Sequence, residues 1–158
     1  MDHSTKTGFS FGITSAIITT LGLMMGLYAG THSRLAVIGG ILTIAIADAF
    51  SDALGIHVSE EFEGIHNSRE VWVSTSSTFF TKLFFGMTFA VPVLLLDLNT
   101  SVLVSITGGL LLLGSMSFMM ARRGKKKVLN VVGEHIVIAV AVILITNYLG
   151  SWVAGIFV

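Results

Sequence analysis

The sequence predicts an all-α, polytopic membrane protein with five transmembrane helices, and three observations support this fold class. Of the 158 residues, 53% are hydrophobic and only 11% are charged, whereas a soluble domain carries about 25% charged residues. The mean hydropathy is +0.88. The apolar runs are long enough to cross a hydrocarbon core, which takes ~20 residues per helix. We therefore expect residues 1–158 to form a single transmembrane domain.

Composition also excludes several classes of function. The nine basic and nine acidic residues cancel, so no broad basic surface points to a nucleic-acid partner. The absence of cysteine excludes disulfides, thiolate metal sites and thiol catalysis. Glu60 and Glu61 resemble the paired glutamates of some membrane proteases, but Ile65 stands where those carry arginine. With no HExxH motif or phosphate loop either, we expect no enzymatic activity and no resident cofactor.

The first span is predicted at about 9–29 and read as a retained helix, because it is longer than a signal-peptide core. Ser15 and Thr19 lie one turn apart in it. Their hydroxyls serve helix packing on one interpretation; on the other they face the carboxylates of the second span and line a transport pathway. Four glycines leave this helix without side chains at positions where a neighbouring helix can approach closely: Gly8, Gly12, Gly22 and Gly26.

The second span, at about 35–57, carries two acids into the membrane. Asp48 and Asp52 lie one turn apart on one helical face. On an insertion scale each costs roughly 2.5 to 3.5 kcal/mol at the centre of a spanning helix. Such residues need a cation, a proton or a partner, so they point to ion binding and transport; a neutral, hydrogen-bonded structural pair is the alternative.

The remaining spans are predicted at about 74–97, 100–120 and 130–155. Ser68 is expected to cap the third helix, with Glu70 in its first turn. Pro92 is expected to bend that helix, because proline removes a backbone hydrogen bond. A basic run at 121–127 separates the last two spans.

Basic residues are distributed unequally between the two predicted faces. One face holds eight, and the other holds only Arg34. This positive-inside bias predicts a cytoplasmic amino terminus and a carboxyl terminus outside. The eight are Lys6, Arg69, Lys82, Arg122, Arg123, Lys125, Lys126 and Lys127.

The acidic residues are predicted to form a line that runs from the cytoplasm into the bilayer. Oxygen ligands suit Mn²⁺ and Fe²⁺, and protons compete with such cations for a buried carboxylate. This competition is the minimal requirement of a proton-coupled exchanger. The acids near the surface are either capture ligands or a solvated helix end. The predicted metal ligands are Asp48, Asp52, Glu60, Glu61, Glu63 and Glu134.

The run ILTIAIADAFSDALGIHVSEE at 41–61 resembles the second helix of the vacuolar iron transporter family, with that family's conducting acid at Asp48. The glycine-rich first helix and AVPVLLL around Pro92 also resemble it. The resemblance implies a homodimer that exports Fe²⁺ or Mn²⁺ in exchange for protons along a path between the protomers. It implies a multi-pass protein of the cell membrane, or of a vacuolar-type membrane in a eukaryote.

The chain departs from that family's pattern in three places. Phe11 replaces a first-helix acid, Ile56 replaces a methionine, and the cytoplasmic metal-binding helices are reduced to about 58–75. We therefore expect a short member without the metal-binding domain, in which Asp52 replaces the missing acid. The alternative is a non-transporting scaffold or regulatory protein that keeps the transporter fold.

Overall fold

The computed structural model describes residues 3–157, and within them the chain is helical with short connections. Five of its helical segments are long and apolar enough to cross a membrane, which confirms the predicted fold class. The elements are α1 (His3–Thr31), α2 (Arg34–Glu63), α3 (Ser68–Thr88), α4 (Ala90–Leu95), α5 (Leu98–Arg123) and α6 (Val128–Phe157). Helices α3 and α4 together make the third span.

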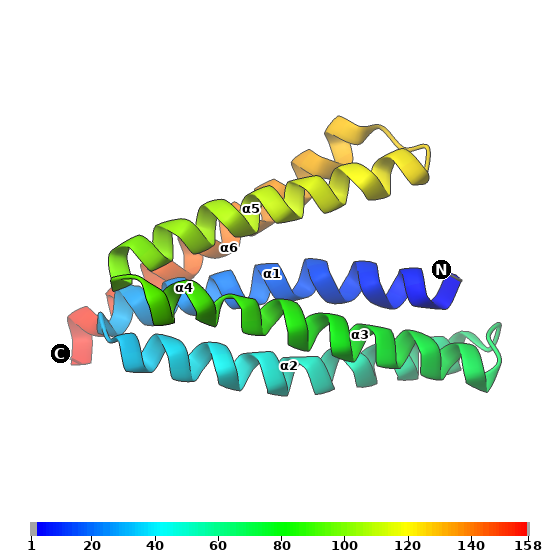
Figure 1. Cartoon of the computed structure of the whole chain (residues 1–158), viewed down its shortest axis with the longest axis horizontal. Helices are drawn as coiled ribbons and strands as arrows, with labels where there is room; N and C mark the ends of the chain where they lie inside the picture. The colour runs from blue at the N-terminus through cyan, green and yellow to red at the C-terminus, as the bar shows by residue number, and fades with distance from the viewer. Residues whose placement is uncertain (1–2, 158) are drawn as a thin grey trace.

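Helix α1 is the centre of the bundle, in contact with α2, α3, α5 and α6 (Figure 1). Helices α2 and α3 run beside it, while α5 and α6 diverge from it toward the end at which the chain begins (Figure 1). Two glycines bring α1 onto the backbone of α3. A Cβ at Gly8 would overlap the carbonyl oxygen of Ser74, and one at Gly12 would lie 2.9 Å from that of Thr78. This close approach sets the geometry of the site described below.

Polar residues define the ends of α2 and α3. Gly64 ends α2 in the left-handed conformation, with φ 66°, which glycine adopts without strain. Asn67, and not the predicted Ser68, caps α3, because Asn67 is the last extended residue and Ser68 is already helical. The Asn67 side-chain oxygen Oδ1 accepts the Glu70 backbone N–H at 3.0 Å, and the Glu70 carboxylate accepts the Asn67 backbone N–H at 3.0 Å. This reciprocal pair is a capping box.

The third span is interrupted at Phe89, three residues before Pro92. The proline nitrogen has no hydrogen to donate to the preceding turn, so the sequence correctly located a disturbance there. Arg34 supports the end of α4. Its Nε donates to the Val93 carbonyl at 2.7 Å, and its Nη2 donates to the Leu96 carbonyl. A guanidinium is favourable at the negative end of a helix.

The start of α1 and the α2–α3 and α5–α6 connections lie at one end of the bundle, and the carboxyl terminus lies at the other (Figure 1). This arrangement agrees with an odd number of spans. The count of basic residues at the two membrane faces needs one correction. Lys82, a residue of α3, is buried within the bundle and does not belong to either face. Eight minus Lys82 leaves seven basic residues against Arg34. The cytoplasmic position of the amino terminus stays a prediction.

Candidate functional site

The candidate site is a cluster of three charged side chains where α1, α2 and α3 meet, and Lys82 is its centre. Lys82 is only 1% exposed. The buried face of α3 repeats every four residues through Ser74, Thr78, Lys82 and Gly86. A helix presents residues at this spacing on one side, so the lysine is directed into the bundle with the hydroxyl residues of the same face.

The Lys82 ammonium binds groups on both neighbouring helices. It donates to Ser15 Oγ at 2.8 Å and to Asp52 Oδ2. The Ser15 hydroxyl in turn donates to Asp52 Oδ2 at 2.6 Å, so serine, lysine and aspartate form a closed triangle. Of the two expected hydroxyls, Ser15 therefore faces the carboxylates. Thr19 instead donates to the Ser15 carbonyl at 2.9 Å.

Asp48 is less well satisfied than Asp52. Its Oδ2 lies 2.7 Å from Lys82 Nζ, which is an ion-pair distance. The approach does not meet hydrogen-bond geometry, however, and this buried oxygen has no hydrogen-bond partner. We treat the contact as a charge pair without a directed bond. About a fifth of each carboxylate side chain stays accessible, 19% for Asp48 and 21% for Asp52. When all three groups are charged, two negative charges and one positive charge leave −1.

The other predicted metal ligands do not join this cluster. Glu60 is buried and accepts a hydrogen bond from Ser74 Oγ. It lies eight residues beyond Asp52, or about 12 Å along a helix. Glu61 pairs with His57 at 3.3 Å, while Glu63 and Glu134 are exposed. Within residues 3–157, no three His, Asp or Glu side chains converge as a metal-binding group.

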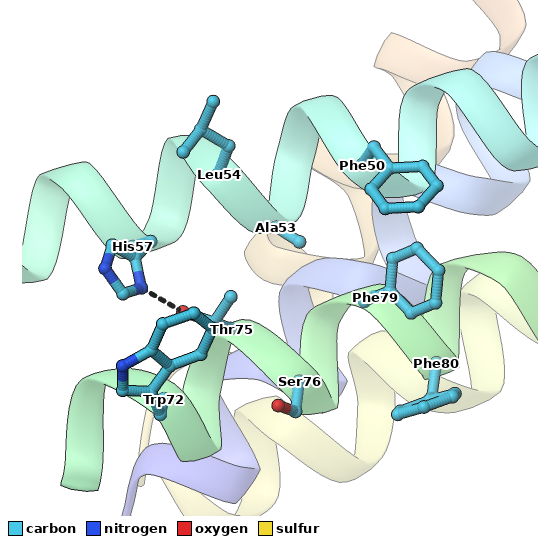
Figure 2. A pocket seen from close by; sticks show the side chains of 9 residues that line it. All are labelled: Phe50, Ala53, Leu54, His57, Trp72, Thr75, Ser76, Phe79 and Phe80. Atoms are coloured by element: carbon cyan, nitrogen blue, oxygen red, sulfur yellow. Dashed lines mark hydrogen bonds between the residues drawn. The ribbon is translucent and has the colours of Figure 1, made fainter.

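A separate, largely apolar pocket of about 340 Å³ lies between α2 and α3 (Figure 2). His57 is its one ionisable lining residue. The His57 ring pairs with Thr75 Oγ1 at 3.0 Å and packs edge-on against Trp72 at 4.7 Å. Because His57 lies nine residues after Asp48, it falls on the opposite side of α2. Asp48, Asp52 and Lys82 do not line this pocket, so it is not part of the charge cluster.

Sequence reasoning missed two features of this site. Lys82 was assigned to a membrane face, although a lysine within the predicted span at 74–97 needs a partner as much as an acid does. The four-residue spacing of Ser74, Thr78 and Lys82 was a usable signal. The burial of Glu60 against Ser74 had no comparable signal, because Glu60 and Glu63 are neighbours three residues apart on the helix and only Glu60 is buried.

We compared the chain with known protein families, with curated proteins and with solved structures. None of the three comparisons found a match.

Proposed function

We propose that this protein is a proton-coupled transporter of divalent metal, Fe²⁺ or Mn²⁺, which moves the ion out of the cytoplasm. One observation supports this proposal above the others. Two carboxylates lie in the membrane-spanning region with a single ammonium between them, and the Asp48 oxygen beside it has no hydrogen bond. The resemblance of the second helix to that of the vacuolar iron transporter family supports the same function. We propose that the protein resides in the cell membrane.

The net charge of the cluster explains the proposed coupling between metal binding and proton release. A divalent cation bound to Asp48 and Asp52 would change the cluster from −1 to +1 if Lys82 kept its proton. Uncompensated charge is costly in a low-dielectric interior. Release of one proton from Lys82 returns the total to zero. Lys82 is thus a tethered cation that competes with the transported ion, and its reprotonation would expel the metal. This gives at least one proton per metal ion.

We propose a homodimer formed through the outer face of α2. Small residues recur there every four residues, all of them exposed: Gly39, Thr43, Ala47, Ser51 and Gly55. A Cβ at Gly39 or at Gly55 would meet no atom within 4 Å. Small residues at this spacing allow two membrane helices to approach closely. Because Ala47 and Ser51 are the neighbours of Asp48 and Asp52, a second copy would cover the accessible part of both acids.

The acids at the end of the bundle would then attract metal from the cytoplasm. Glu61, Glu63 and Glu134 carry exposed carboxylates, so they raise the local cation concentration without forming a closed site. Glu60 is buried against Ser74, and its proposed capture role requires that hydrogen bond to break.

A second candidate is a non-transporting scaffold, and the same cluster favours it in a different way. Lys82 already neutralises one acid and contacts the other. Salt bridges inside a protein can hold helices in a unique arrangement without further activity. On this alternative, the cluster never exchanges its lysine for a metal ion.

The deciding experiment is flux of Fe²⁺ and Mn²⁺ into liposomes, with and without a pH gradient. Asp48→Asn removes one charge with little change of shape, and Glu63→Gln is its matched control on the exposed end of α2. We expect gradient-enhanced flux in wild type and in Glu63→Gln, and at least a tenfold loss in Asp48→Asn, on the order of one lost charged contact. No flux by folded, inserted wild type would favour the scaffold.

A further inference from the structure

A second cavity, remote from the charge cluster, lies between the start of α1 and the end of α5. Its volume is about 790 Å³. At this end of the bundle, α5 and the beginning of α6 diverge from α1 (Figure 1). Three separate segments contribute ionisable side chains to its wall: His3 and Lys6 from α1, Arg123 and Lys126 from the end of α5 and its connection, and His135 from α6.

The charge of this cavity is of one sign. No acidic residue lines it within the described chain. Lys6, Arg123 and Lys126 make no ion pair with any residue from 3 to 157. Lys6, Arg123 and Lys126 carry positive charges that share one cavity, and like charges repel each other. An anion placed among them would relieve that repulsion.

The turn after α5 is what directs Lys126 to this cavity. Gly124 ends the helix, and Lys125 takes the left-handed conformation with φ 53°. The chain then folds back, so that the Lys126 N–H donates to the Ala121 carbonyl at 3.0 Å. Lys126 therefore lines the cavity, while Lys125 and Lys127 do not. Arg122 also faces elsewhere, 5.4 Å above the Phe118 ring.

The basic cavity adjoins a second, mostly apolar cavity of about 380 Å³. The two share Lys6, Ser10, Met120 and Arg123. Beyond these shared residues, the second cavity is lined by Phe9, Met116 and Met119. Methionine side chains are flexible and adapt to irregular apolar ligands. The combined space is therefore positive at one end and apolar at the other.

We propose that this amphipathic cavity binds an anionic phospholipid, with its phosphate group among Lys6, Arg123 and Lys126 and one acyl chain along Met116 and Met119. Basic pockets between transmembrane helices are suited to anionic head groups. A free anion would leave the methionine-lined part unfilled, and a zwitterionic lipid would leave the positive charge uncompensated. The proposal concerns residues outside the charge cluster and does not depend on metal transport.

The test is native mass spectrometry of the purified protein with phosphatidylglycerol or phosphatidylcholine of identical acyl chains. Arg123→Gln/Lys126→Gln removes two cavity charges. The matched control, Arg122→Gln/Lys125→Gln, removes the same charge from neighbouring residues outside the cavity. We expect phosphatidylglycerol to bind wild type at least about tenfold more tightly than phosphatidylcholine. The affinity for phosphatidylglycerol should fall at least about tenfold in the cavity variant, because each basic residue contributes about fivefold. It should fall less than about twofold in the control variant.

A third variant tests the acyl-chain part without changing charge. Ser10 lines both cavities, so Ser10→Leu should narrow the passage between them and weaken phosphatidylglycerol binding in protein of unchanged helicity. Equal binding of the two lipids, or equal losses in the two charge variants, would overturn the proposal. So would inorganic phosphate that raises the melting temperature as much as phosphatidylglycerol does, because it would identify a site for a free anion.

Discussion

Lys82 is the residue whose chemistry matters most to the proposed transport, because it is a cation with a removable proton. Arginine at the same position would keep its charge at any accessible pH, whereas methionine would remove it. We expect Mn²⁺ affinity to fall in the order Lys82→Met, wild type, Lys82→Arg, with steps of about tenfold or more for a full charge in a poorly solvated site. Electron paramagnetic resonance of free Mn²⁺ measures this directly.

The same titration reports the coupled proton. In weakly buffered detergent solution, wild type should release about one proton for each Mn²⁺ bound, by the charge balance of the cluster. Weaker Mn²⁺ binding by Lys82→Met than by wild type would contradict competition and would assign the lysine a purely structural role. Helicity and monodispersity of each variant serve as the controls for folding.

Asp48 and Asp52 should differ although they are neighbours on one face. Asp52 accepts hydrogen bonds from both Lys82 and Ser15, while Asp48 has only the charge contact. If Asp52 replaces the acid missing from the first helix, Asp52→Asn should lower flux in the liposome assay at least tenfold, as we expect for Asp48→Asn, and should lower the melting temperature more. Normal transport by Asp52→Asn would refute this replacement.

Asp97 provides a pH-dependent contribution outside the membrane spans. The Thr100 backbone N–H and the Thr100 side chain both donate to its carboxylate, and they lower the pKa of Asp97 below 3.8. A lowered pKa stabilises the fold above the unfolded-state value, and this stabilisation is lost as the pH falls through the folded-state value. We expect the melting temperature of wild type to exceed that of Asp97→Asn at pH 7. The advantage should disappear below pH 3.8, and a constant difference would exclude the charge as its cause.

At the scale of elements, the contact between α1 and α3 determines whether Ser15 reaches Lys82. Gly12→Ala would place a Cβ 2.9 Å from the oxygen of Thr78, which belongs to the backbone of α3 and cannot turn aside as the end of a side chain can. We expect overpacking to cost about 1–3 kcal/mol of unfolding free energy. Gly133→Ala in α6 is the control, because its Cβ would meet nothing within 4 Å, and it should be neutral or stabilising. Thermal unfolding in detergent measures both, and equal melting temperatures would contradict the close packing.

At the scale of the whole molecule, the proposed dimer can be tested with single thiols, because the chain has no cysteine of its own. Ser51→Cys places a thiol on the small-residue face of α2, and Leu111→Cys places one on the exposed surface of α5. A disulfide forms only where two Cβ atoms come within about 4.5 Å. We expect rapid covalent dimer formation in bilayers for Ser51→Cys and little for Leu111→Cys. The reverse result would place the interface elsewhere.

The sequence by itself determined the class of protein, the five spans and the presence of acids within one of them. Hydropathy and helical spacing are local properties, so they are readable wherever a span is long and uninterrupted. The sequence also located the disturbance near Pro92, because it arises from the backbone of that residue. The cap of α3 was misplaced by one residue, since Asn67 and Ser68 are both good capping residues and only the local backbone geometry selects between them.

Only the tertiary structure decided what the acids contact. Lys82 is thirty residues from Asp52 along the chain, and hydropathy records that it is charged without recording its partner. The same holds for Ser74 beside Glu60, and for Lys6 across the basic cavity from Arg123 and Lys126. Each of these groupings depends on which faces of separate helices meet and on where helices diverge. The physical reason is that the energy of a buried charge depends on its neighbours in space, whereas hydropathy depends on its neighbours in sequence.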